Sequence, residues 1–130
     1  MSEPAEPAPL PPLQRFGPAL LALGWGFALW ALSPIIAGTR EPWDAAWPLY
    51  SLAMVFGGAA GGWWLPRRPV SAYLGLWLGQ VLALSLLPGR DLGWLPLGLV
   101  TTAIGALIGL GAYLAGWLAR HAWQRFADRP

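Results

Sequence analysis

Gln80 is the only strongly polar side chain in the middle of a long apolar stretch of this chain, and Thr101 and Thr102 follow in the next such stretch. A polar group at such a depth can line a path for ions, hold a polar ligand, or hydrogen-bond a neighbouring helix. Gln80 adjoins Gly79, a small residue that permits close helix contact, which favours the hydrogen-bonding role. A path lined by Gln80, Thr101 and Thr102 is the alternative.

His121 is the only histidine and lies next to Arg120, where the last apolar stretch ends. One imidazole could ligate a haem iron or a chlorophyll magnesium, but a histidine at a helix end beside arginine is more often solvated. His121 is therefore a weak candidate for cofactor binding. The chain has no cysteine, no acid–histidine cluster with metal-ligand spacing, and no plausible Ser–His–Asp grouping. We expect no catalytic residues, no metal and no cofactor.

Arginine supplies all eight of the basic residues. Arg67 and Arg68 follow one apolar stretch, and Arg120 and Arg125 follow another. Their default partners are anionic lipid headgroups, and an acidic patch on another protein is the sharper alternative. The formal net charge of +2 is too small to indicate nucleic-acid binding.

The composition places these residues in a membrane protein. Hydrophobic residues make up 56% of the chain and charged residues 11%, whereas a soluble domain carries about 25% charged residues. About 20 apolar residues at a rise of 1.5 Å cross the hydrocarbon core of a bilayer. We predict an all-α integral membrane protein with four spans in an antiparallel up-down bundle. The expected spans cover residues 16–37, 45–65, 70–87 and 94–118.

The charged tails and connections predict the orientation. Residues 1–15 are expected to form a proline-rich flexible tail, residues 16–119 the transmembrane domain, and residues 120–130 a short basic tail. Arginine accumulates on the cytoplasmic side of membrane proteins. Six arginines fall at the ends that would share a side with both termini, against Arg40 and Arg90 on the other. Both termini are therefore predicted to be cytoplasmic. The abundance of Arg, Ala, Gly and Pro, with no Lys, favours a bacterial inner membrane.

Small residues recur at helical spacing in every predicted span, so each helix has one face suited to close approach. In the fourth span these positions advance by three or four residues and share one line. In the second span two G-x-x-x-G pairs overlap. Neither a dinucleotide fingerprint nor a P-loop fits this glycine cluster, because the required glycine or lysine is missing. Whether these faces meet within one chain or between chains stays open at this point. The packing glycines are Gly57, Gly58, Gly61, Gly62, Gly75, Gly79, Gly98, Gly105, Gly109 and Gly116.

Two functional hypotheses follow. The first is a non-catalytic accessory or structural subunit, or an assembly factor, of a larger membrane complex, because packing faces are abundant and buried chemistry is scarce. Its partners would be other membrane subunits or a second copy, together with anionic lipids. The second is a small homo-oligomeric channel or transporter whose path is lined by Gln80, Thr101 and Thr102.

Overall fold

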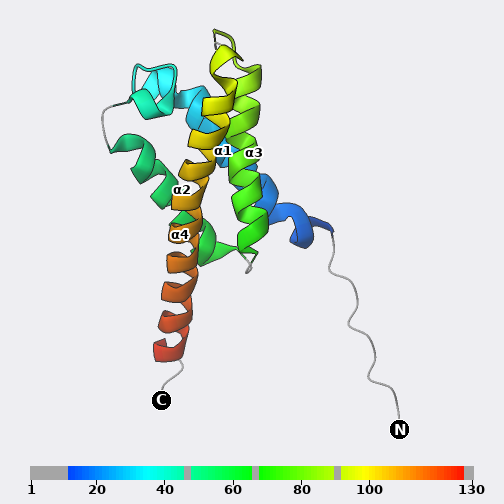
Figure 1. Ribbon diagram of the computed structural model, residues 1–130. Coiled ribbons are helices and arrows are strands. Elements are labelled where there is room, and N and C mark those ends of the chain that lie inside the picture. Colours follow the sequence, from blue (N-terminus) through cyan, green and yellow to red (C-terminus); the bar gives the residue numbers. More distant parts are fainter. Residues whose placement is uncertain (1–11, 46–47, 66–67, 90–91, 128–130) are drawn as a thin grey trace.

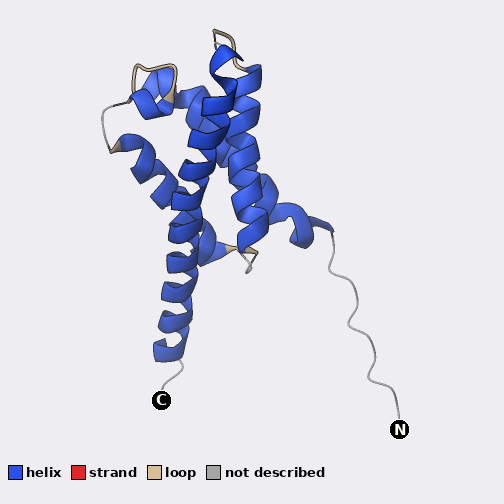
Figure 2. Ribbon diagram, in the orientation of Figure 1, coloured by secondary structure: helices blue, strands red, loops and turns tan. Residues whose placement is uncertain are grey.

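The computed structural model describes residues 12–45, 48–65, 68–89 and 92–127, and over these residues the chain contains helices and short connections (Figures 1 and 2). The elements are α1 (Pro12–Ile36), the 3-10 helix η1 (Pro42–Asp44), α2 (Leu49–Trp64), α3 (Pro69–Leu86), the 3-10 helix η2 (Leu92–Trp94) and α4 (Leu95–Ala127).

Local sequence sets where the helices begin and end. Gly38 follows α1 with φ of 69°, and Gly89 follows α3 with φ of 78°. Glycine adopts this left-handed conformation without steric cost, so it turns the chain just past each helix. Pro69 begins α3, where its missing N–H would have had no partner within the helix.

Three helices are long and apolar enough to cross a membrane: Phe16–Ile36 within α1, α3 and α4. Their length and composition confirm the expectation of an all-helical, multi-pass membrane protein. The helix α2 has 16 residues and does not qualify by the same measure. At 1.5 Å per residue it is about 24 Å long, against a hydrocarbon core of about 30 Å.

Three helix bounds differ by more than one residue from the expected span limits. The helix α2 begins at Leu49, four residues after the expected start of the second span, with Pro48 at its N-cap; proline disfavours a helical conformation in the residue before it. The helix α1 begins at Pro12, inside the segment expected to be a flexible tail, because proline is well tolerated in a first helical turn. Residues 1–11 of that tail lie outside the described residues. The helix α4 continues to Ala127, nine residues past the expected end of the fourth span, because Ala119–Ala127 contains no glycine or proline that would end a helix.

The four helices form two tightly packed pairs, α1 with α3 and α2 with α4. In the first pair Gly75 faces Ala19 and Gly79 faces Leu23, so the contacting positions rise together along both helices. In the second pair Gly58 faces Gly109, and Gly62 faces Tyr113, in the same sense. Each pair is therefore parallel, whereas α3 and α4, which are consecutive in the sequence, run in opposite directions (Figure 1).

The two helical hairpins, α1–α2 and α3–α4, are related by an approximate two-fold axis along the bundle. In the α1–α3 pair, Gly79 packs on Leu23 and Gly26 packs on Leu76. An offset of 53 residues therefore relates Leu23 to Leu76 and Gly26 to Gly79. In the α2–α4 pair, Gly62 packs on Tyr113 and Gly116 packs on Ala59. Here an offset of 54 residues relates Ala59 to Tyr113 and Gly62 to Gly116. A nearly constant offset thus relates both helix pairs. Several membrane transporters contain parallel repeats with an axis of this kind.

Large apolar side chains lie on the outside of the bundle, whereas its interior contains many glycines. Ile35 is 80% exposed, and Val70 and Leu86 are each 69% exposed. Among the residues that the structure describes, the large side chains that are fully buried are few: Trp30, Met54, Gln80 and Thr102. This distribution suits a lipid environment, where apolar surface needs no burial and helix association depends on close van der Waals contact.

Candidate functional site

Gln80 lies at the centre of a buried hydrogen-bond cluster that joins three helices. Tyr50 of α2 donates a hydrogen bond of 2.6 Å to Oε1 of Gln80 on α3. Nε2 of Gln80 donates to the backbone carbonyls of Leu76 at 3.3 Å and Thr102 on α4 at 3.4 Å. The side chain of Gln80 is fully buried. Its amide oxygen and nitrogen are thus both bonded within the bundle, so in this conformation they hold helices together and do not face an open path.

Thr101 and Thr102, the two threonines proposed to line a path, differ in how deeply they are buried. Thr102 is fully buried, and its hydroxyl donates to the carbonyl of Gly98 at 2.8 Å. Thr101 is only partly buried, and its hydroxyl donates to Leu97 at 2.9 Å. Both hydroxyls therefore bond back to α4 itself. The structure brings Gln80 to the backbone of Thr102 and does not bring Thr101 into the cluster.

The packing glycines fall into two classes according to what faces them. A Cβ atom added at Gly58, Gly62, Gly75, Gly79 or Gly116 would overlap the backbone of the neighbouring helix. A Cβ atom added at the other five would meet a side chain: Trp25 at Gly57, Tyr113 at Gly61, Leu84 at Gly98, Tyr50 at Gly105 and Leu76 at Gly109. All ten glycines thus face atoms of this same chain, so these contacts lie within one chain.

His121 and the arginines gather at the basic end of the bundle, which we define as the end where α2 and α4 finish and α3 begins. The exposed ring of His121 lies against the ring of Trp117, with ring centroids 4.7 Å apart and the ring planes tilted by 34°. Among the described residues no group of three or more His, Cys, Asp or Glu could hold a metal ion. His121 therefore has an aromatic neighbour and no ligand cluster around it.

Two of the arginines at this end tie helix ends together. Nη1 of Arg120 donates to the carbonyl of Trp63 at 2.9 Å, which links α4 to the last turn of α2. The backbone N–H of Arg68 donates to the hydroxyl of Tyr113 at 3.3 Å. Arg125 is exposed in the last turn of α4. Arg67 lies outside the described residues.

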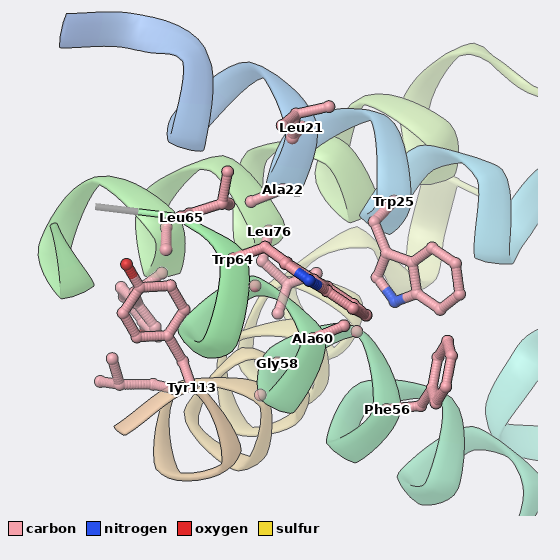
Figure 3. Close-up of a pocket in the computed structure, with 16 residues that line it drawn as sticks. Leu21, Ala22, Trp25, Phe56, Gly58, Ala60, Trp64, Leu65, Leu76 and Tyr113 are labelled. Carbon is pink, nitrogen blue, oxygen red and sulfur yellow. The ribbon is translucent and has the colours of Figure 1, made fainter. Parts of the chain in front are cut away.

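An apolar groove opens between α1 and α2, which have few contacts with each other. Its larger chamber has a volume of about 290 Å³ and extends from Trp25 and Phe56 at mid-bundle to Leu65 and Tyr113 at the basic end (Figure 3). A second chamber of about 170 Å³ continues past Trp25 toward the opposite end. Trp25 separates the two, and its Nε1 donates to the carbonyl of Ala53 at 3.2 Å.

The groove could not be predicted from the sequence. Its lining residues are ordinary membrane residues, and the groove exists because α1 pairs with α3 while α2 pairs with α4. The position of Trp25 in the middle of an apolar stretch was the available signal, since an indole N–H at membrane depth needs an acceptor. Comparisons of the chain with protein-family models, curated proteins and solved structures found no match.

Proposed function

We propose that this chain is a non-catalytic, four-span protein of a bacterial inner membrane that serves as an accessory subunit or assembly factor of a larger membrane complex. The observation that carries the proposal is the continuation of α4 beyond the bundle, as a helix with one apolar and one polar face. The absence of a metal-ligating cluster among the described residues fits this role.

The parallel pairing of α1 with α3 supports the four-span topology. If α1 and α3 both cross the membrane in the same direction, the chain must cross back between them. Among the residues that the structure describes, α2 is the only α-helix between α1 and α3 and so the one available for the return. The short α2 packs against the longer α4, and local thinning of the bilayer can accommodate a short span. The arginine distribution then favours cytoplasmic termini.

The projecting segment of α4 supports a role in binding a partner. The 33 residues of α4 extend about 50 Å, whereas the hydrocarbon core is about 30 Å thick. At 100° per residue, the apolar side of this segment is an arc of about 140° that contains Leu118, Ala122, Phe126 and Trp123. The remaining polar arc contains Arg120, Gln124 and Arg125. Leu118 is 58% exposed and Trp123 is 66% exposed. An exposed apolar side flanked by arginines suits a partner surface with an apolar centre and an acidic rim.

The test is purification of the full chain from its native membrane in a mild detergent. We expect a defined, stoichiometric set of membrane subunits to co-purify. Trp123→Asp should abolish this association. Gln124→Asp, which adds the same charge about 100° round the helix on its polar side, should preserve it. A homo-oligomer without other subunits that conducts ions or transports a solute in liposomes would contradict the proposal and favour the channel.

A further inference from the structure

The groove between α1 and α2 has the shape and chemistry of a site for one lipid chain. Its larger chamber is lined by leucine, alanine, glycine and aromatic side chains contributed by all four helices. Aromatic rings stand at both of its ends, with Trp25 and Phe56 at mid-bundle and Tyr113 at the basic end (Figure 3). This larger chamber therefore offers apolar contact along its length, and the hydroxyl-bearing side chains in its lining, Tyr73 and Tyr113, lie toward the basic end.

The size of the chamber favours a flexible chain over a helix. A cavity of about 150 Å³ accommodates benzene, so 290 Å³ has room for roughly twice as many carbon atoms. An α-helix with side chains is about 10 Å across, so the same volume would hold only about 4 Å of its length, which is less than one turn. A partner's transmembrane helix could cover the groove but could not enter it, whereas an acyl chain could.

The positive charge of the arginines at the basic end indicates that the headgroup of the bound lipid is anionic. Arg68 directly precedes α3, and its backbone N–H donates to the hydroxyl of Tyr113. Arg120 belongs to α4, and its guanidinium group contacts the last turn of α2. Among the described residues the carboxylates are Glu41 and Asp44, which lie at the opposite end of the bundle near η1. The mouth of the groove is thus electropositive, and arginine pairs well with a phosphate group.

We propose that the groove binds one acyl chain of an anionic glycerophospholipid, whose phosphate headgroup lies at Arg68 and Arg120. The chain lies between α1 and α2 and ends near Trp25, which closes the chamber at mid-bundle. The bound lipid fills the space that α1 and α2 leave between them and connects the two packed helix pairs, α1–α3 and α2–α4, along this side. Apart from Arg120, this site uses none of the residues named for the partner surface on α4.

The test is native mass spectrometry of the full chain in detergent, titrated with phosphatidylglycerol or with phosphatidylcholine. We expect one tightly retained phosphatidylglycerol. Ala60→Phe places a ring in the groove, and it should weaken retention about tenfold, as expected for two displaced methylene groups. The control is Ala115→Phe, the same change at an exposed position of α4 outside the groove. Ala60→Leu provides a milder version if the phenylalanine variant does not fold.

The headgroup is tested by Arg68→Gln, which keeps the backbone bond to Tyr113 and removes the charge. It should reduce the preference for phosphatidylglycerol over phosphatidylcholine several-fold, and Arg40→Gln at the opposite end should leave that preference unchanged. Equal retention by the Ala60 and Ala115 variants would overturn the acyl-chain site. Equal affinity for the two lipids in the unaltered chain would overturn the headgroup assignment. If the Ala60 variants instead release a co-purifying protein, the occupant is a partner segment and the proposal is wrong.

Discussion

Tyr50 and Gln80 form a hydrogen bond of 2.6 Å between the phenolic hydroxyl and the amide oxygen, and this bond ties α2 to α3 inside the bundle. Because α2 is the shortest of the four α-helices, its attachment depends on such specific contacts as well as on its packing against α4. The bond also occupies the side-chain amide oxygen of Gln80, which could otherwise face a transported species.

Tyr50→Phe should therefore destabilise the folded protein by about 1 kcal/mol, within the range of up to about 1.7 kcal/mol found for interhelical bonds in membranes. The ring is kept, so the loss reports the hydrogen bond. Titration of the detergent-solubilised protein with a denaturing detergent measures it. The control is the same change in a Gln80→Leu background, where the cost should largely disappear. Equal costs in both backgrounds would show that the bond contributes nothing.

Gly79→Ala should cost more stability than any single change at an exposed glycine. The added Cβ would lie 2.9 Å from the carbonyl carbon of Leu23, so α1 and α3 would have to separate. We expect a loss of about 1–3 kcal/mol, typical of overpacking. Gly111→Ala is the matched control, because nothing lies within 4 Å of its added Cβ. That variant should be neutral or more stable by up to about 1 kcal/mol, owing to the higher helix propensity of alanine.

Gly109→Ala should be milder than Gly62→Ala, although both glycines lie in the α2–α4 contact. At Gly109 the added Cβ would meet the end of the Leu76 side chain, which can rotate away. At Gly62 it would meet the backbone of Tyr113, with the carbonyl carbon 2.8 Å away. Thermal unfolding of the two variants in the same detergent ranks them. The reverse order would mean that the backbone contact at Gly62 is not needed for folding.

The four-span topology predicts opposite accessibility for two single-cysteine variants. The natural chain has no cysteine, so Thr39→Cys and Arg68→Cys each introduce a unique thiol. If α2 crosses the membrane, a membrane-impermeant maleimide applied to intact cells should label position 39 and leave position 68 unlabelled until the cells are broken. Labelling of both positions from outside would rule out a crossing by α2, and labelling of position 68 alone would invert the predicted orientation.

The projecting part of α4 should contribute little to the stability of the bundle. Trp123→Ala removes a side chain that is 66% exposed, and the melting temperature in detergent should be unchanged. Trp30→Ala removes a fully buried ring that packs edge-on against Trp43, with centroids 4.6 Å apart, and should cost about 3–5 kcal/mol. A large loss at Trp123 would indicate that the end of α4 packs against the bundle, which would remove the argument for a partner surface there.

The amino-acid sequence by itself determined that this protein is helical and membrane-embedded, and approximately where its helices lie. These properties depend on local composition: long apolar runs, prolines at the starts of helices and glycines just past their ends. The sequence also determined which face of each helix permits close contact, because the spacing of small residues reports the helical period.

The tertiary structure decided which of those faces meet. Gly79 could have contacted any smooth helix, in this chain or another, and only the three-dimensional arrangement places it on Leu23 and places Gly62 on Tyr113. The groove beside Trp25 and the Tyr50–Gln80 bond follow from the same pairing of helices. The physical reason is that small residues make close approach possible without specifying a partner. The choice depends on the combined fit of all four helices, to which residues far apart in the sequence contribute at once.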